Sequence, residues 1–323
     1  MRGLTRSAAG KPTVVLVVPI LPSMLEMLEK EFTVFRLWEA PESNAALASW
    51  AESAQALVTS ADGPVNARLL DALPNLKIVS TMSTGLDHID LDAARAGGIA
   101  VTNTPEVTAE AVADLAMALV LHVAYQIAPG RHSACARGSL EALPPPRRSV
   151  AGTCVGILGL GCVGLAFARR AQAFGMRISY YEPRRKPDVG YAYCSDLEVL
   201  ARHVDYLVIT APGGTATRHL VDARVLAALG SGGTLINVGR GSIVDERALI
   251  DALSDGTLGA AALDVFAHEP HVPHELRALD NVVLLPHVGS ATLEARAAMA
   301  QLVVDNLRAY FAGKVLLTPV VQA

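Results

Sequence analysis

Short apolar runs alternate with longer helical patterns along most of this chain, and this alternation constrains the fold more than any other feature. Runs of strand length joined by helical stretches predict parallel sheets covered by helices on both faces. Four runs precede residue 105 and about six follow it, so we predict an α/β protein with two doubly wound parallel-sheet domains and a cleft between them. The runs are Val14–Val18, Ala56–Thr59, Lys77–Thr81, Val101–Asn103, Cys154–Leu158, Arg177–Tyr181, Tyr206–Thr210, Thr234–Val238, Ala260–Asp264 and Val282–Leu285.

The composition fits buried sheets and argues against several classes of partner. The chain has 323 residues, of which 51% are hydrophobic and 18% charged, enough for two sizeable cores. A net charge of −4 without long charged runs argues against nucleic-acid binding. The four cysteines form no C-x-x-C pair, and the run Val14–Val18 is too short for a membrane span or signal segment. We therefore expect a cytoplasmic protein with reduced thiols and no membrane partner.

A glycine-rich turn follows the run Cys154–Leu158 directly and precedes a helical pattern over Leu165–Phe174. Its residues are Gly159-Leu160-Gly161-Cys162-Val163-Gly164, which is the G-x-G-x-x-G pattern in a strand–turn–helix setting. Gly159 permits a tight turn, Gly161 lets the backbone approach a pyrophosphate, and Gly164 lets the helix pack close to the strand. This predicts a Rossmann-type dinucleotide site at a helix N-terminus. A glycine-rich turn without a ligand is the alternative.

The residues after the next strand bear on which dinucleotide binds. Glu182 lies eighteen residues after Gly164, where an acidic side chain accepts hydrogen bonds from ribose hydroxyls and repels a 2′-phosphate. Arg184, Arg185 and Lys186 follow at once and would attract that phosphate. We expect NAD(H) rather than NADP(H), with use of both left open.

Two residues at strand ends and a nearby carboxylate form a candidate reacting centre. Arg240, between two glycines after Thr234–Val238, has the planar fork that binds a carboxylate. His287 follows Val282–Leu285 and can exchange a proton with a carbonyl oxygen. Glu269 would raise the pKa of His287 and fix its tautomer. An ion-paired surface Arg240 and a structural His287 are the alternatives.

Three further segments carry expectations of another kind. His268, His271 and His274 have a metal-like spacing, but prolines interrupt the segment and no cysteine is near, so we assign no metal site. The segment Pro105–Ile127, with Thr108 as its N-cap, reads as a helix apolar nearly all round, which indicates a subunit interface or a buried intramolecular helix. Arg131–Ser149 is predicted as a loop.

The whole set of motifs resembles the D-specific 2-hydroxyacid dehydrogenase family, from about residue 13 to the end. Within that family, Val155–Thr318 is most similar to the hydroxypyruvate/glyoxylate and hydroxyphenylpyruvate reductase branch. Besides the glycine-rich turn, the resemblance rests on Pro74–Val79, Ser83–Asp90, Val101–Pro105, Ala113–Ala116, Asn237–Glu246, Ala261–Phe266, Pro286–Thr292 and Leu316–Val321.

The resemblance implies an NAD(P)-dependent enzyme that interconverts small 2-oxo acids and D-2-hydroxy acids, with glyoxylate, hydroxypyruvate or aryl pyruvates as substrates. Arg240, His287 and Glu269 would be its catalytic residues. The fold would comprise a discontinuous substrate-binding domain, 1–105 plus 290–323, and a Rossmann dinucleotide-binding domain, 106–289, in a homodimer. Besides Arg240 and His287, the substrate would contact Met82, Thr84 and Gly85, and the remaining cofactor contacts would be Cys162, Val163, Pro212, Thr217, Val238, Gly239, Asp264 and Gly289.

Two departures from the branch and two rival functions bear on these expectations. NADPH-using reductases of the branch often have a small residue and then Arg where this chain has Glu182-Pro183, and here the Arg comes one position later. They also often carry a dimer-loop Trp near the position of Leu140, which leaves substrate choice open. An NAD(H)-sensing corepressor and a phosphite dehydrogenase-like oxidoreductase are the alternatives, whereas the Gln that formate dehydrogenases place at Glu269 is absent.

Overall fold

The computed structural model describes residues 10–39, 48–127 and 148–322 and divides the chain into two compact units. Unit 1 comprises residues 1–107 and 293–323, and unit 2 comprises residues 108–292. The sequence placed the two divisions at 105/106 and 289/290, close to these positions. The expected Arg131–Ser149 loop, Cys135 and Leu140 lie wholly or largely outside the described residues.

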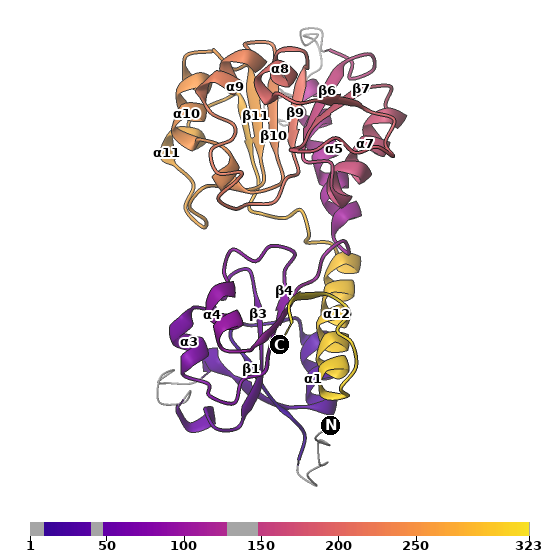
Figure 1. The fold of residues 1–323 in the computed structure, drawn as a ribbon. Coiled ribbons are helices and arrows are strands. Elements are labelled where there is room, and N and C mark those ends of the chain that lie inside the picture. Colours follow the sequence, from indigo (N-terminus) through magenta and orange to yellow (C-terminus); the bar gives the residue numbers. More distant parts are fainter. Residues whose placement is uncertain (1–9, 40–47, 128–147, 323) are drawn as a thin grey trace, which may run out of the picture. The chain divides into compact units, whose positions relative to one another are not determined.

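Unit 1 is a sheet covered by helices on both faces, as Figure 1 shows. The strand order among described residues is β13-β5-β4-β3-β1-β2, which contains the flavodoxin-like order 2-1-3-4-5. The pairs are parallel except β13 with β5, which is antiparallel. Its elements are β1 Thr13–Leu16, α1 Pro22–Glu31, β2 Thr33–Arg36, the 3-10 helix Leu37–Glu39, β3 Ala54–Ser60, α3 Ala67–Asp71, β4 Ile78–Met82, α4 Leu91–Ala96, β5 Ala100–Thr102, α12 Leu293–Phe311 and β13 Pro319–Val321.

Unit 2 is a parallel sheet with helices on both faces. Its order is β12-β11-β10-β9-β6-β7-β8, the Rossmann order 3-2-1-4-5-6 with one strand added. Every pairing among its described strands is parallel. Its elements are α5 Ala109–Tyr125, β6 Cys154–Leu158, α7 Cys162–Ala173, β7 Arg177–Tyr181, β8 Ala192–Cys194, α8 Leu197–Arg202, β9 Tyr206–Ile209, α9 Ala223–Leu229, β10 Thr234–Asn237, the 3-10 helix Gly241–Ile243, α10 Glu246–Ser254, β11 Ala260–Leu263, α11 His274–Arg277 and β12 Val282–Leu284.

Each sheet separates two apolar clusters, which is why its central strands read as continuous apolar runs. In unit 2, α5 and α7 bury Met117, Val120 and Phe167 on one face, while α8, α9 and α10 bury residues such as Leu200, Leu226 and Leu249 on the other. In unit 1, α3 and α4 cover one face and α1 and α12 the other. The predicted fold class, two doubly wound α/β domains, is confirmed.

The predicted strand count was too low, because β2, β8 and β13 were missed. All three lie at sheet edges, where a strand has one partner and half its surface open, so it needs no continuous apolar run. β13 also begins with Pro319, which cannot donate to a ladder and suits only an edge. The expectation of purely parallel sheets is wrong for β13 alone.

The predicted helix over Pro105–Ile127 is α5, shorter at both ends. Thr108 occupies its N-cap position, as predicted, and its side chain makes no capping hydrogen bond. The last turn ends at Gln126 in the left-handed conformation, with φ of 48°. Of the described helices, none is long and apolar enough to cross a membrane.

Candidate active site

The predicted cofactor and catalytic residues of unit 2 all follow the carboxyl ends of its strands. Residues 159–164 follow β6, Glu182 and Arg184 follow β7, and Pro212 follows β9. The segment from Val238 follows β10, that from Asp264 follows β11, and that from His287 follows β12. Because these strands are parallel, their carboxyl ends meet at one edge of the sheet, where α/β proteins bind ligands.

The glycine-rich turn has the geometry of a pyrophosphate site. Gly159 has φ of +93°, and a Cβ there would lie 2.7 Å from Cα of Ala211 after β9, so only glycine fits. A Cβ on Gly161, the N-cap of α7, would meet nothing within 4 Å. The first turn of α7 leaves backbone N–H groups without intrahelical acceptors. The residues present therefore fit a dinucleotide, whose phosphates the open backbone at Gly161 and the first N–H groups of α7 would hold.

Glu182 is tied to the glycine-rich turn by its side chain. Its Oε1 accepts a hydrogen bond from Leu160 N at 2.7 Å and lies 3.8 Å from Lys186 Nζ. Of the basic run, Lys186 therefore contacts Glu182, while Arg184 and Arg185 are exposed. The carboxylate of Glu182 therefore lies beside the glycine-rich turn, directly after β7.

Thr217 and Pro212 belong to one loop after β9. Thr217 Oγ1 donates to the carbonyl oxygen of Pro212 at 2.9 Å, which closes the loop on itself. The structure thus groups these two predicted cofactor contacts beside the glycine-rich turn, since β9 is the neighbour of β6.

Arg240 sits in a turn that a buried amide holds. Asn237, 1% exposed, donates from Nδ2 to the Arg240 carbonyl oxygen at 3.0 Å and accepts Gly239 N at 3.0 Å. The guanidinium donates from Nη1 to the Gly239 carbonyl oxygen at 2.8 Å. A Cβ on Gly241 would lie 1.9 Å from the carbonyl carbon of Phe266, so the Arg240 turn packs backbone to backbone against the loop after β11.

Glu269 and His287 form a hydrogen-bonded pair, as the sequence predicted. His287 Nδ1 lies 2.7 Å from Glu269 Oε2, and Glu269 Oε1 accepts Phe266 N at 2.9 Å. The hydrogen bond to Glu269 raises the pKa of His287, although burial and Arg240 oppose the rise. Burial alone would raise the pKa of Glu269, but the hydrogen bonds from His287 and Phe266 lower it below its ordinary value. The side chain of His287 is 39% exposed and that of Glu269 is 36% exposed, so the pair is accessible to a small molecule.

Asp264 holds the loop that carries His287. His287 has φ of +54°, a left-handed conformation that costs a non-glycine residue about 1–2 kcal/mol. The Asp264 carboxylate accepts Val288 N and Gly289 N at 2.8 Å each, which fixes the two residues after His287. Burial raises the pKa of Asp264 despite these two donors. The sequence assigned Asp264 only to the cofactor and missed this role.

Two other side chains that shape the site were missed. Asn237 fixes the Arg240 turn, and Glu246 of α10 accepts Ala267 N at 3.0 Å beside the Glu269 loop. Asn237 belongs to a motif on which the resemblance rests, but both residues act on backbone groups, and no spacing rule points to such a role. Only the packing of neighbouring loops assigns it.

The remaining predicted residues lie elsewhere. Met82, Thr84 and Gly85 end β4 and begin the loop after it, in unit 1. His268 and His271 form an isolated antiparallel bridge. In the described part of the chain, no group of three or more histidine, cysteine or acidic residues is placed to hold a metal ion.

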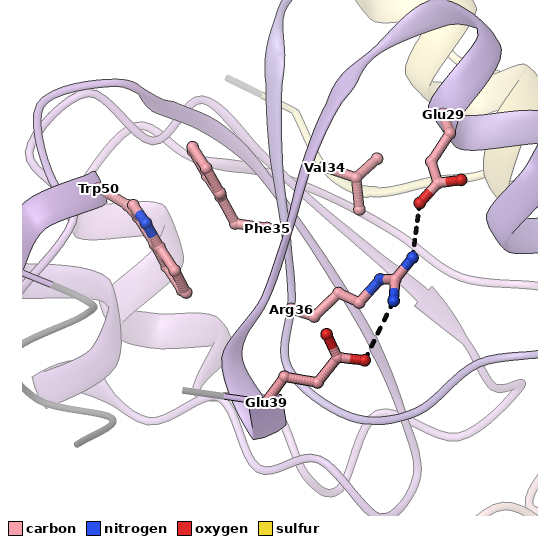
Figure 2. Close-up of a pocket in the computed structure, with 6 residues that line it drawn as sticks. All are labelled: Glu29, Val34, Phe35, Arg36, Glu39 and Trp50. Atoms are coloured by element: carbon pink, nitrogen blue, oxygen red, sulfur yellow. Dashed lines mark hydrogen bonds and ion pairs between the residues drawn. The ribbon is translucent and has the colours of Figure 1, made fainter. Parts of the chain in front are cut away.

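A pocket of about 340 Å³ lies beside the edge strand β2 in unit 1 and contains no predicted site residue. Figure 2 shows Arg36 between the carboxylates of Glu29 and Glu39, at 2.7 and 3.0 Å, with Phe35 and Trp50 stacked beyond. The one guanidinium of this pocket is already paired with both carboxylates, and we assign the pocket no part in the reaction.

Comparisons with known proteins agree with this geometry. The model of the D-isomer specific 2-hydroxyacid dehydrogenase NAD-binding domain matches residues 117–289. Glyoxylate/hydroxypyruvate reductase A of Arabidopsis thaliana is 48% identical, over 95% of this chain and 98% of that protein. Hydroxyphenylpyruvate reductase of Plectranthus scutellarioides is 46% identical over the same shares.

A solved structure extends the similarity to the whole fold. The NADPH-dependent glyoxylate/hydroxypyruvate reductase of Sinorhizobium meliloti, in complex with NADP and malonate, is 42% identical. The match covers 96% of this chain and 97% of that one, with a TM-score of 0.88. The predicted family and cofactor class are thereby confirmed. The chain belongs to the D-isomer specific 2-hydroxyacid dehydrogenase family and is an NAD(P)-dependent oxidoreductase.

Proposed function

We propose that the protein reduces small 2-oxo acids to D-2-hydroxy acids, with glyoxylate and hydroxypyruvate as the preferred substrates and aryl pyruvates as further ones. The observation that carries the proposal is the His287–Glu269 pair, at 2.7 Å, at the same sheet edge as Arg240 and the glycine-rich turn. The names of the relatives favour 2-oxo acid reduction over a corepressor or a phosphite-oxidising role.

The proposed chemistry assigns one task to each residue. The nicotinamide, when bound, supplies a hydride to the carbonyl carbon. Arg240 binds the substrate carboxylate and carbonyl oxygen through its planar fork. His287 donates a proton from Nε2 to the carbonyl oxygen, because Nδ1 is engaged by Glu269. Glu269 keeps His287 protonated to higher pH, since the hydrogen bond raises the pKa of the imidazole.

The proposed binding regions follow the two units. Unit 2 holds the dinucleotide through the glycine-rich turn, including Cys162 and Val163, and the loops after the neighbouring strands. Those loops contribute Glu182, Arg184, Pro212, Thr217, Val238, Gly239, Asp264 and Gly289. In unit 1, the backbone of Thr84 and Gly85, with Met82, contacts the substrate.

NADH is the proposed cofactor, because Glu182 already accepts a hydrogen bond within the turn and would repel a 2′-phosphate. The Sinorhizobium meliloti relative is NADPH-dependent, so family membership alone does not favour NADH. The proposed preference for NADH therefore depends on Glu182 of this chain. Glu182→Ser should shift the kcat/KM ratio toward NADPH. A wild-type kcat/KM at least tenfold higher with NADPH would refute the preference.

One set of measurements tests the function as a whole. Initial rates are measured with NADH and NADPH against glyoxylate, hydroxypyruvate, phenylpyruvate and hydroxyphenylpyruvate, with phosphite and NAD⁺ as the competing reaction. We expect the highest kcat/KM with glyoxylate or hydroxypyruvate. Turnover of phosphite alone would contradict the proposal.

We further propose a homodimer in the cytoplasm. The apolar character of α5 supports the dimer, and the free thiols of Cys154, Cys162 and Cys194 suit a reducing compartment. Sedimentation equilibrium tests the assembly, and a monomer at micromolar concentration would contradict it.

A further inference from the structure

A chain of hydrogen bonds in unit 1 runs from the core of α12 to the loop after β4. It begins at Asn306, which is fully buried. The Asn306 amide donates to Leu302 O and to Thr318 Oγ1, both at 2.9 Å. Its Oδ1 accepts Leu317 N and Thr318 N at 3.0 and 3.2 Å. With both donors and both acceptor positions used, this amide fixes the residues just before β13.

Thr318 connects this region to the segment after β5 by a hydrogen bond. Its hydroxyl, oriented by the Asn306 donor, donates to the Asn103 carbonyl oxygen at 2.6 Å. The Asn103 side chain in turn donates from Nδ2 to the Thr84 carbonyl oxygen at 2.9 Å. The chain of bonds therefore ends on the loop that begins at Ser83.

Residues 103 and 104 hold this loop at three points. Besides the bond from Asn103 to Thr84, the N–H of Thr104 donates to the Ser83 carbonyl oxygen at 3.0 Å. The Thr84 hydroxyl donates to the Thr104 carbonyl oxygen, also at 3.0 Å. The carbonyls of Ser83 and Thr84 thus both point toward the segment after β5.

Fixing these two carbonyls also fixes two N–H groups. The carbonyl of one residue and the N–H of the next share a planar trans peptide and point in opposite directions. The N–H groups of Thr84 and Gly85 therefore point together to the side away from Asn103. Two successive N–H groups on one side of a loop form a small anion site, which suits a carboxylate.

We infer that Thr318 and Asn306 are positioning residues for the substrate carboxylate, acting through Asn103 on the peptide planes of Ser83 and Thr84. The inference rests on the proposed function. Because every 2-oxo acid carries the carboxylate, loss of the positioning affects glyoxylate and hydroxypyruvate alike. The dinucleotide binds to other residues, so its affinity is unaffected.

The test compares Thr318→Val, which removes the hydroxyl at constant size, with Thr318→Ser, which keeps it. Thr318→Val should raise KM about three- to tenfold for both acids, the usual worth of one hydrogen bond, with kcat changed less than KM. Thr318→Ser should restore KM. The dissociation constant for NADH should stay at the wild-type value in both variants.

Asn66→Ala is the matched control, because it removes a helix cap from α3 in the same unit and touches none of these bonds. It should lower the melting temperature and leave KM unchanged. Hydrogen exchange of the peptide that spans residues 83–104 should rise in Thr318→Val and not in the control.

A double-mutant cycle with Asn103→Ala tests the route. Asn103→Ala should itself raise KM, and adding Thr318→Val should raise it by less than the product of the two single effects, because both substitutions loosen the same hold on the loop. Additive effects would overturn the route. The inference would be overturned if Thr318→Val had the wild-type KM, or if Asn66→Ala raised KM as much as Thr318→Val does. In either case the proposed function would still stand, provided that the wild-type protein reduces the two acids. If the wild type reduces neither acid, the function fails and the inference with it.

Discussion

Replacing Gly161 by alanine separates folding from cofactor binding in the turn after β6. A Cβ there meets nothing within 4 Å, and the backbone φ of −73° suits an L-residue. Replacing glycine by alanine at an N-cap lowers the free energy of unfolding by about 0.5–1 kcal/mol. Alanine also restricts the unfolded chain, which raises the same free energy by about 0.4–1 kcal/mol. The two terms nearly cancel, so the melting temperature should change by no more than about 2 °C.

The cofactor meets a different situation, because the new methyl group occupies the space where the pyrophosphate would lie. Each hydrogen bond to a charged group that is lost costs about 1.5–3 kcal/mol. The dissociation constant for NADH should therefore rise roughly 10- to 150-fold, measured by calorimetric titration.

Gly232→Ala serves as the control for this substitution. Gly232 is equally open and exposed, but it precedes β10 and so lies at the amino edge of the same sheet. The control should keep both the wild-type stability and the wild-type affinity. If Gly161→Ala binds NADH as tightly as the control does, the glycine-rich turn is not the pyrophosphate site.

Four other substitutions have expected outcomes. Arg240→Lys keeps the charge but loses the fork, so KM for hydroxypyruvate should rise and NADH affinity stay constant in steady-state and titration measurements. Reduction should fall as pH rises through the raised pKa of His287, and Glu269→Gln should move that fall to lower pH in a kcat/KM profile, whereas an unmoved profile would refute the pairing. Thr104→Val removes a buried hydroxyl that lacks a partner among the described residues, so the free energy of unfolding in urea should stay unchanged or rise by about 1 kcal/mol. Thr102→Val breaks a buried hydrogen bond, so the same free energy should fall by about 1–2 kcal/mol.

The sequence predicted those parts of the fold and site that depend on strand order. Parallel strands place their carboxyl ends together, so Arg240 after β10 and His287 after β12 were expected at one edge before any geometry was known. The pairing of His287 with Glu269 followed from charge and from the family resemblance, and the structure has it at 2.7 Å.

The parts that the sequence missed depend on contacts with backbone groups. Asn237, Glu246 and Asn306 each hold a loop by hydrogen bonds to main-chain atoms. The main-chain partner in such a hydrogen bond offers the same N–H or carbonyl group whatever its side chain is. A sequence pattern therefore does not identify that partner. The edge strands were missed for a related reason, since their ladders also depend on backbone groups and need few apolar side chains.

The same backbone contacts explain how three loops hold one catalytic arrangement. Gly241 lets the Arg240 turn touch Phe266, and Phe266 N donates to Glu269. Asp264, from the same loop as Phe266, holds the two residues that follow His287. Each link has a main-chain group on at least one side, and main-chain groups have no rotamers, so at most one side chain per link has to be held by packing. A proton and a hydride must reach adjacent atoms of one carbonyl, and a misplacement of about 1 Å costs roughly 10²-fold in rate. We therefore expect substitutions that preserve these backbone links to be tolerated at the sheet edge. Substitutions that add a side chain at Gly241 should displace all three proposed catalytic residues together.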